Sequence, residues 1–590
     1  MIVPMKKVTI LVTQKEAGVA LQALRRLGVL HIKHIQEPVA KGIAVLEREL
    51  ANCNQALLAL SQKHKGRRRS YCEHIPAYIR EILSLARERQ DCAHQINLIQ
   101  KKIDIFKEWG RVSIASLRIL QEAGIFVRLY VGKKRLIKSL AAEGVLHIVK
   151  EEKGKLYCAL ITSNPQPKEG LKEVQLPEEE FESLYAEQLK KARRLEAIDK
   201  RLAQLCELKE CILAHKKDLL KNLEFNKVRF GMGQEEGFCY LQGFSPKDAV
   251  SRLGAVAERQ GWGILIEEPD DPAEVPTLIR NPRWIEIIKP VFSFMGTVPG
   301  YTEYDISLCF LFFFSIFFAM LIGDAGYGFI FIALTYFIRR KLRTAPAAVF
   351  FLMYVLSTAT IVWGAVTGTW FGAQGIAQLP ILNAMVIERI NSFIADNQSF
   401  LIYICFLIGA VHLSVAHLIV AWRFINSLVA LSQIGWVCII WTAFFIAGRL
   451  VLGRPLPPAV SVLGIVGALL VVLFSRPQKN VIKGVAISLA DLPLKAINSF
   501  ADVVSYLRLF AVGYATVAVA ATFNNMAVGA RIDNILAGFI AAMILFLGHS
   551  LNIILGLMAV IVHGVRLNML EFSSHLNMQW SGIEYKPFRE

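Results

Sequence analysis

The sequence lacks the short motifs with which enzymes most often bind nucleotides, metals or acyl groups. It has no G-x-x-x-x-G-K-[ST] loop, no protein-kinase motif set, no G-x-S-x-G and no H-E-x-x-H. We therefore expect no catalytic residues, no cofactor and no bound metal in this chain. A chain of this composition is not expected to hydrolyse a substrate by itself.

Cysteine spacing also excludes common classes of site. The ten cysteines form no C-x-x-C pair and no His/Cys pattern with metal-ligand spacing. Cys53, Cys92 and Cys206 fall on apolar stripes of predicted helices. We expect them to be buried, reduced thiols, as in a cytosolic protein.

The first 285 residues lack long apolar runs, and the opening MIVPMKKVTILVT does not have the pattern of a signal peptide. This half is expected to be cytosolic. Residues 305–575 are membrane-like, so the 54% hydrophobic residues and the mean hydropathy of +0.43 average two unlike halves. A linker at 286–304 joins the halves, and a cytosolic tail is expected at 576–590.

The net charge of +18 does not indicate nucleic acid as a partner. Lys and Arg are spread along helices and membrane flanks, and no RNA- or DNA-binding motif is present. A membrane protein with large cytosolic parts is expected to carry such an excess.

The cytosolic half predicts an elongated, dumbbell-like domain of α/β lobes and coiled-coil arms. Two β-α-β lobes, at 1–40 and 237–270, are expected to meet at one end. Apolar residues at heptad spacing predict antiparallel arms at 41–110 and 177–225. A distal lobe of strands is predicted at 112–163. The ends of the dumbbell are the favoured docking surfaces.

The membrane half predicts eight transmembrane helices, the last two of them long. With the N-terminus in the cytosol, the cytosolic loops and tail hold eleven Lys and Arg against four in the outer loops. This distribution places the C-terminus in the cytosol as well. The predicted spans are 306–322, 326–339, 347–366, 399–421, 429–447, 457–474, 498–525 and 535–569.

Arg508 lies inside the apolar stretch 498–526. A guanidinium does not lose its proton, and placing it near a bilayer centre costs from about 3 to more than about 10 kcal/mol. Such a residue normally faces protein or water and has a function. The alternative is a structural arginine that caps carbonyls or snorkels near a helix end, which is less favoured for Arg508 than for Arg566.

Small residues share the helical face of Arg508, namely Ala501, Ala511, Ala515, Ala518 and Thr522, together with Val504. Small side chains allow another helix to approach closely in a membrane. A neighbouring stripe of polar residues could line a wet path, and it comprises Asn498, Asp502, Ser505 and Thr516. In the last span, His549, Asn552 and His563 form a similar stripe with Arg566 at its edge. Two consecutive helices of this kind suggest ion handling.

Three segments resemble the V/A-type rotary ATPase subunit that is called a in V-ATPases and I in bacterial and archaeal enzymes. SYLRLFAV (505–512) is similar to its arginine motif, and HGVRLNMLEF (563–572) is similar to its second-arginine motif. MGTVPGYTEYDISLCFLFFFSIFFAMLIGDAGYG (295–328) resembles the segment that enters the membrane. The resemblance covers essentially the whole chain.

The resemblance implies a membrane stator that forms proton or sodium half-channels against a ring of proteolipid c (or K) subunits. It also implies peripheral stalks of E and G type and a rotor adaptor on the central-stalk side as partners, in a cell membrane. Arg508 matches the essential arginine and Arg566 the second one. Thr516 and Gly556 stand where the eukaryotic pattern has a histidine and a glutamate, so the polar path and the choice of ion do not transfer.

Two other classes of function remain open on the residues alone. A secondary transporter would need repeated halves with broken helices, and the sequence shows no such repeat. A membrane scaffold that binds partners through its coiled coil would leave Arg508 without a role.

Overall fold

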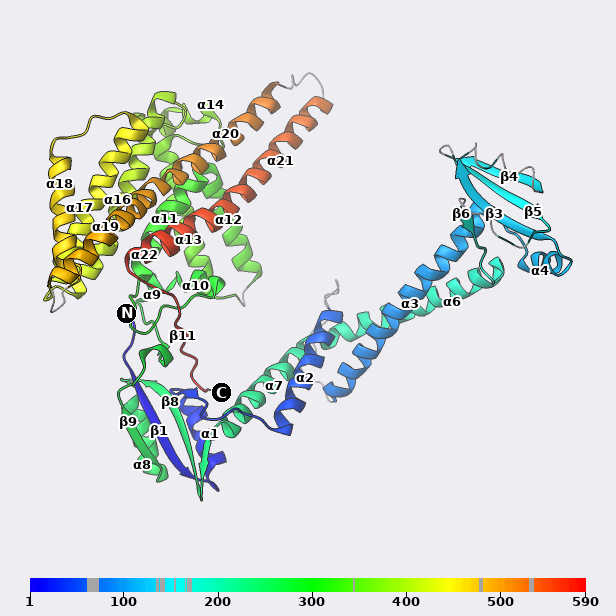
Figure 1. Ribbon diagram of the computed structural model, residues 1–590, viewed down its shortest axis with the longest axis horizontal. Helices are drawn as coiled ribbons and strands as arrows, with labels where there is room; N and C mark the ends of the chain where they lie inside the picture. The colour runs from blue at the N-terminus through cyan, green and yellow to red at the C-terminus, as the bar shows by residue number, and fades with distance from the viewer. Residues whose placement is uncertain are drawn as a thin grey trace. The chain divides into compact units, whose positions relative to one another are not determined.

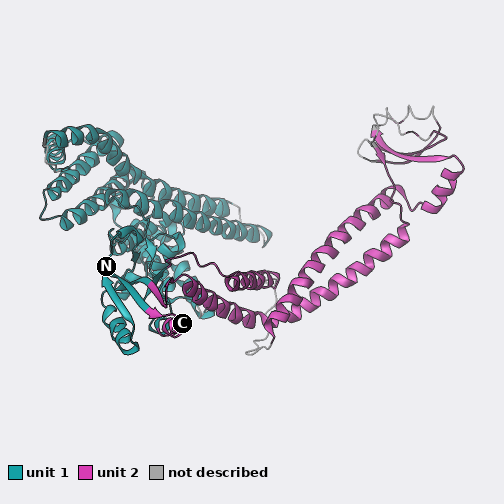
Figure 2. Cartoon of the chain, turned by 60° about the horizontal axis from the view of Figure 1, so that its bottom comes forward, with its two compact units in different colours: residues 1–11, 24–33, 242–589 teal, residues 12–23, 34–241, 590 magenta. Residues whose placement is uncertain are grey.

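The computed structural model describes residues 1–60, 74–133, 137, 144–152, 155–164, 166, 172–342, 345–476, 481–529 and 535–589. The chain divides into two compact units, which are coloured separately in Figure 2. The first holds residues 1–11, 24–33 and 242–589, and the second holds residues 12–23 and 34–241.

The second unit is built on paired helices, drawn in blue to green in Figure 1. Glu81 pairs with Arg201, Glu88 with Arg194 and Lys102 with Glu179, so residue numbers rise along one helix as they fall along its partner. This register makes the pair antiparallel. The helices are α2 (Lys41–Ala59), α3 (Ile75–Trp109), α6 (Phe181–Leu205), the short η2 (Cys206–Leu208) and α7 (Lys209–Phe230).

Apolar side chains fill the seam between these helices. Ile82, Ile198 and Ile212 are almost fully buried there. Cys53, Cys92 and Cys206 are buried free thiols of the same seam, which is where the heptad spacing predicted apolar side chains. The helix seam is therefore the hydrophobic core of this unit.

A four-stranded antiparallel sheet lies at the far end of the α3–α6 pair (Figure 1). Its order is β4-β5-β3-β6, and it includes a short strand at 172–174 that the sequence pattern did not indicate. The elements are α4 (Ile114–Glu122), β3 (Phe126–Lys133), β4 (Val145–Glu152), β5 (Lys155–Thr162) and β6 (Lys172–Val174).

Residues from both ends of the first 270 residues form one sheet of order β2-β8-β1-β9. Strand β1 pairs antiparallel with β9, and β2 pairs antiparallel with β8. Two β-α-β segments interleaved in this way give the split β-α-β arrangement. The elements are β1 (Met5–Thr13), α1 (Ala17–Leu27), β2 (His31–Lys33), β7 (Gly233–Glu235), β8 (Phe238–Pro246), α8 (Val250–Gln260) and β9 (Gly263–Glu267).

The C-terminal segment packs against other parts of the first unit, to which it belongs. Strand β11 (Ile583–Glu584) pairs in parallel with β10 (Pro276–Thr277), after the short turn η3 (Pro272–Glu274). The Tyr585 hydroxyl donates to the Val29 carbonyl at 2.7 Å, and the Phe588 N–H donates to the Leu30 carbonyl at 2.8 Å. Burial raises the pKa of Tyr585 to about 12. The segment 576–589 is thus bound to the lobe that contains β1 and β2.

Five helices in the described part of the chain are long and apolar enough to cross a bilayer, or six if one bent pair counts as a single span. The bent pair turns by 116° between α11 and α12, and a shorter apolar helix covers Ala459–Phe474. The count of eight spans remains a prediction. The helices are α9 (Arg283–Glu286), α10 (Lys289–Met295), α11 (Ser307–Ile322), α12 (Ala325–Lys341), α13 (Ala347–Thr367), α14 (Gln374–Ala377), α15 (Pro380–Asn383), η4 (Glu388–Ile390), η5 (Ala395–Asn397), α16 (Gln398–Arg423), α17 (Val429–Leu452), α18 (Ala459–Phe474), α19 (Val481–Ser505), α20 (Leu507–Gly529), α21 (Ile535–Ala559), the π-helical η6 (Val560–Gly564) and η7 (Leu567–Phe572), and α22 (Ser573–His575).

One buried carboxylate fixes the bend between α11 and α12. Asp324 caps α12 by accepting from the N–H groups of Gly326 and Tyr327 at 2.8 and 3.3 Å. It also accepts from the N–H groups of Phe371 and Gly372 at 2.9 and 2.8 Å. Four N–H donors satisfy this buried carboxyl group and tie the bend to the segment after α13.

The helix before Arg508 begins earlier than the sequence predicted. The expected loop at 475–497 is in fact helical from Val481 onward, as part of α19. Lys483, Lys495 and the internal Pro493 interrupt its apolar pattern, so the hydrophobic run alone placed the start too late.

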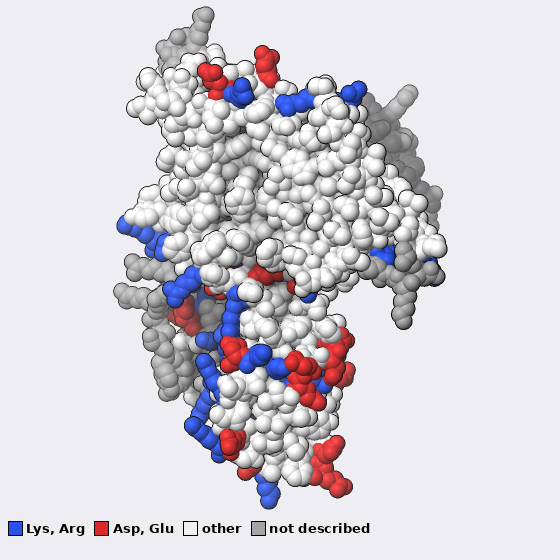
Figure 3. All heavy atoms as spheres, turned by 90° about the vertical axis from the view of Figure 1, so that its left-hand side faces the viewer, with Lys and Arg blue, Asp and Glu red and all other residues white. Residues whose placement is uncertain are grey.

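Aromatic and aliphatic side chains from α11, α16, α19 and α20 form the core of the helical part. Phe310, Phe317 and Phe406 are almost fully buried in it. On the face shown in Figure 3, the helical part is nearly free of Lys, Arg, Asp and Glu between charged groups at its two ends. This surface suits a hydrocarbon environment.

Candidate ion-translocation site

Arg508 lies in the first turn of α20, directly after a break in the helix at Tyr506. Tyr506 is completely buried, and its hydroxyl lies 2.7 Å from Nδ1 of His412. The guanidinium Nε of Arg508 donates to the Ser505 carbonyl at 3.2 Å. The arginine side chain remains 25% exposed in the chain alone.

Glu571 is the partner of Arg508, and the sequence analysis did not identify it. Nη2 of Arg508 lies 2.9 Å from Oε1 of Glu571, and Nε of Arg566 lies 3.5 Å from the same oxygen. Ser505 donates its hydroxyl to this oxygen at 3.3 Å. The glutamate side chain is only 4% exposed. Two predicted arginines thus meet around one buried carboxylate.

A local change of helix type accounts for this meeting. Residues 560–564 and 567–572 are π-helical. In an α-helix, the side chains of residues five apart point in different directions. The i→i+5 hydrogen bonds of a π-helix bring such residues onto the same face. The π-helical turns therefore bring Arg566 and Glu571 onto one face, toward Arg508.

The predicted ring-contact face is exposed. Ala511, Ala515 and Ala518 all lie on the solvent-accessible side of α20 in the chain alone. Helices α20 and α21 pack side by side (Figure 1). Their outward surface therefore carries Arg508 among small side chains.

Three of the predicted polar residues belong to one hydrogen-bonded group. The Asn552 amide donates to the Thr516 carbonyl at 2.8 Å and to the Tyr327 hydroxyl at 2.9 Å. That hydroxyl lies 2.8 Å from Nδ1 of His549. Nε2 of His549 lies 3.1 Å from Oδ1 of Asn524. We name these five residues the Asn552 group.

The other predicted residues are placed apart from that group. Asp502 contacts His575, and Ser505 contacts Glu571. His563 is half-buried on η6. Among the described residues, it joins neither the Asn552 group nor the contacts around Glu571. A Cβ on Gly556 would lie 4.0 Å from Cγ2 of Thr516. The two positions that depart from the eukaryotic pattern are therefore neighbours.

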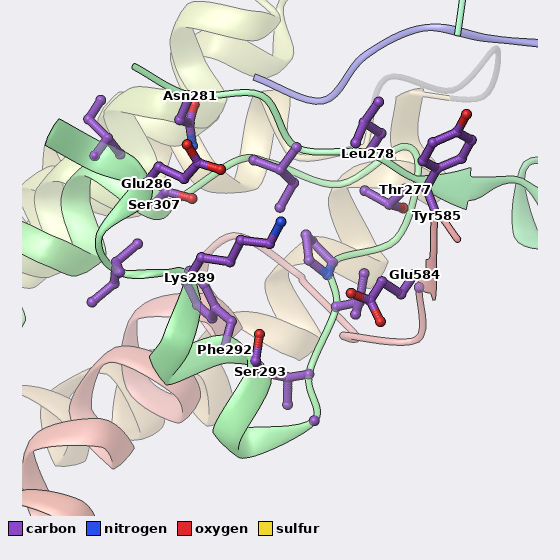
Figure 4. Close-up of a pocket in the computed structure, with 18 of the residues that line it drawn as sticks. Thr277, Leu278, Asn281, Glu286, Lys289, Phe292, Ser293, Ser307, Glu584 and Tyr585 are labelled. Atoms are coloured by element: carbon purple, nitrogen blue, oxygen red, sulfur yellow. The ribbon is translucent and has the colours of Figure 1, made fainter. Parts of the chain in front are cut away.

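A separate cavity of about 510 Å³ lies where the linker meets the C-terminal strand. Residues 277–299 and 582–586 supply most of its lining, and Lys289 points its ammonium group into it (Figure 4). Glu286 and Glu584 also line it, so its charges are mixed. It contains none of the predicted site residues.

Long apolar helices, a capped bend and two arginines around a buried glutamate define a multi-pass membrane protein with a charged site within its helices. The chain belongs to the family of V-type and A-type ATP synthase subunit I. It is 30% identical over 625 residues to V-type ATP synthase subunit I 1 of Treponema pallidum, with 100% of both chains covered. It is 31% identical over 631 residues to V-type ATP synthase subunit I of Borreliella burgdorferi, again with 100% of both chains covered.

A more distant relative is A-type ATP synthase subunit I of Methanocaldococcus jannaschii, 25% identical over 403 residues, with 60% of this chain and 56% of the relative covered. Among solved structures, the cytoplasmic N-terminal domain of subunit I, homolog of subunit a, of V-ATPase matches 44% of this chain and 99% of its own, at 16% identity and a TM-score of 0.24. No protein-family model matches the chain. As a subunit I, the chain is an accessory membrane subunit and not the catalytic one.

Proposed function

We propose that this chain is the membrane stator of a rotary V/A-type ATPase or ATP synthase. Its helical part would form two ion half-channels against a proteolipid ring, and its first half would hold the peripheral stalks. The observation that carries the proposal is Arg508, which stands on an exposed face of small residues within a long apolar helix.

The physics of a rotating ring explains the need for such an arginine. A ring carboxylate that faces lipid must be neutral or ion-bound, because a bare charge is costly there. Opposite a fixed cation the charged form is favoured, since a nearby positive charge lowers a carboxylate pKa. The ring site would release its ion at Arg508 and bind a new one after passing it. The same cation would prevent ions from leaking directly between the half-channels.

The Asn552 group supports an outer half-channel. In the predicted topology, α20 runs from Leu507 toward the outer side, where it ends at Gly529. Thr516 lies midway along this helix, and Asn524 lies near its outer end. The hydrogen-bonded residues between them would line a polar path along which an ion moves from the outer surface to the ring.

The predicted topology completes this proposal. Eight spans with the N-terminal half and the C-terminus in the cytosol would place the paired helices of the second unit beside the ATPase head. Stalk subunits of E and G type would dock at the lobes, and the rotor adaptor would face the same side. Scattering from residues 1–285 should then give a radius of gyration well above the value of about 19 Å for a compact domain of this length. A compact profile would refute the elongated domain.

Purification in mild detergent tests the proposed function against its alternatives. Recovery of the chain with a proteolipid ring and an ATPase head supports the rotary stator. A chain that transports ions by itself in vesicles would instead be a secondary transporter. A chain that neither transports nor binds a ring would be a scaffold.

A further inference from the structure

A second line of polar residues connects four helices of the helical part, and in the predicted topology it lies on the cytosolic side of Arg508. Oε1 of Gln433 lies 2.6 Å from Nδ1 of His417, and Nε2 of His417 lies 2.9 Å from Nδ1 of His575. Nε2 of His575 lies 3.1 Å from Oδ2 of Asp502. These four residues come from α17, α16, α22 and α19, and we name them the His417 chain.

The interior of the His417 chain is shielded from solvent, while its ends are not. His417 is buried, with the ring of Trp436 stacked over it, and the His575 side chain is only 8% exposed. Asp502 is 29% exposed and precedes Arg508 by six residues. Gln433 is half-buried near the start of α17, just after the predicted cytosolic loop 422–428.

The His417 chain can form all of its hydrogen bonds in two arrangements that differ by one proton. In the first arrangement the amide oxygen of Gln433 faces His417, and because an amide oxygen only accepts, Nδ1 of His417 carries a hydrogen. A neutral His417 then accepts at Nε2 from the Nδ1–H of His575. The Nε2 of a neutral His575 is then also bare, and it faces a carboxylate oxygen of Asp502. Two acceptors at 3.1 Å are joined only if one more proton lies between them.

The opposite polarity of the chain satisfies the same contacts without that proton. If the Gln433 amide turns, its NH₂ group donates to Nδ1 of His417. Each histidine then donates from Nε2, and an ionised Asp502 accepts the last bond. The two arrangements differ by one proton on the Asp502–His575 pair. The arrangement with Oε1 of Gln433 toward His417 carries the extra proton, and we name it the loaded arrangement.

We infer that the His417 chain is a proton relay between the cytosolic side and the ring, and that the coupling ion is therefore the proton. This inference rests on the proposed stator function. It assigns the cytosolic half-channel to His417 and His575, which neither motif contains, and it selects between the proton and sodium.

The transfer balances as one proton in and one proton out. A proton binds Nδ1 of His417 from the Gln433 side as the amide turns, and His417 releases its Nε2 proton to Nδ1 of His575. His575 releases its own Nε2 proton to Asp502. Asp502 gives the proton to the ring carboxylate, and the two rings return to their first tautomers. Only N–H and O–H bonds form and break, and no electron is transferred.

Sodium does not suit this route. Hard cations in proteins bind several oxygen atoms at once. The middle of the chain offers two imidazole rings that contact each other directly, at 2.9 Å. A proton passes such a contact by exchanging bonds, whereas a sodium ion would have to separate the rings.

The test uses the complete complex, with ring and head, in vesicles that contain a pH-sensitive dye and no sodium. The wild-type complex should take up protons when ATP is added. His417→Gln and His575→Gln should lower the uptake by roughly tenfold or more, because an amide cannot relay a proton as an imidazole does. Trp436→Phe is the matched control, since it disturbs packing on His417 but removes no proton carrier.

Normal proton uptake by an assembled His417→Gln or His575→Gln complex would overturn the relay. So would a wild-type complex that transports sodium and takes up no protons, and this measurement decides the matter even if neither variant assembles. If Arg508→Ala abolishes uptake while both histidine variants remain active, only the relay fails. If assembled Arg508→Ala complexes remain active, the proposed function itself fails.

Discussion

The guanidinium of Arg508 and the carboxylate of Glu571 form an ion pair at 2.9 Å across 63 residues of sequence. Arg566 reaches the same carboxylate oxygen at 3.5 Å. Two cations around one anion leave a net charge of one positive unit. A single ring carboxylate would balance that charge. The cluster would therefore attract a passing ring carboxylate with a net charge of one positive unit and not two.

Neutralising Glu571 should therefore impair the cycle while the arginine is still present. In Glu571→Gln the net positive charge rises, and we expect the passing carboxylate to be held too strongly in its charged form. A shift of about one pKa unit changes its release roughly tenfold, so ion uptake should fall by about that factor. Glu584→Gln, which changes an exposed glutamate paired with Lys586 at 3.2 Å, should leave uptake unchanged. Equal rates for the two variants would contradict the charge balance.

Arg566→Ala should be milder than the same change at Arg508. Its side chain is 53% exposed and is farther from Glu571 than that of Arg508. Water can therefore replace part of the electrostatic stabilisation that Arg566 gives to Glu571. Vesicle uptake measured beside subunit content should give a partial loss for Arg566→Ala. A loss as complete as that of Arg508→Ala would show that both cations are required.

The small-residue face should not tolerate bulk. Ala515→Phe would push the ring away from Arg508, so we expect most of the uptake to be lost. Val462→Phe adds comparable volume at an exposed position on α18, and it should have little effect. A cysteine at position 515 should cross-link to a ring subunit. Cross-links formed only to lipid-facing probes would argue against this face as the ring contact.

The paired helices of the second unit should weaken in acid. The hydrogen bond from Arg194 lowers the pKa of Glu88, and the one from Lys102 lowers the pKa of Glu179. A lowered pKa in the folded state contributes stability above the unfolded value of 4.5, which is lost as the pH falls below it. The melting temperature of residues 1–285 should drop between about pH 5 and about pH 3. The double variant Glu88→Gln, Glu179→Gln should show a smaller drop.

The sequence identified some site residues because a single position carried a strong signal. Arg508 stands out because a permanent charge in an apolar run is costly. The Asn552 group was partly predictable, since His549 and Asn552 recur at helical spacing. The sequence predicted two spans joined at GDAGYG (323–328), but neither the bend there nor the role of Asp324 was predicted.

Other residues had no such signal. Glu571 lies near the end of a hydrophobic segment, where a lone glutamate is normally solvated. Its burial depends on π-helical turns that no apolar periodicity reveals. His417 and His575 are 158 residues apart in sequence, so only the packing of α16 against α22 brings them together. The early start of α19 was hidden by the charged residues and the proline on its exposed side.

The most direct measurement is ATP-driven ion uptake by vesicles that contain an assembled Arg508→Ala complex. The account predicts that uptake is abolished while subunit content is unchanged, because the ring site then has no fixed cation at which to release its ion. Arg508→Lys should also lose most of its activity, since a buried lysine can deprotonate and cannot reproduce the guanidinium geometry. Uptake at the wild-type rate by an assembled Arg508→Ala complex would contradict the mechanism.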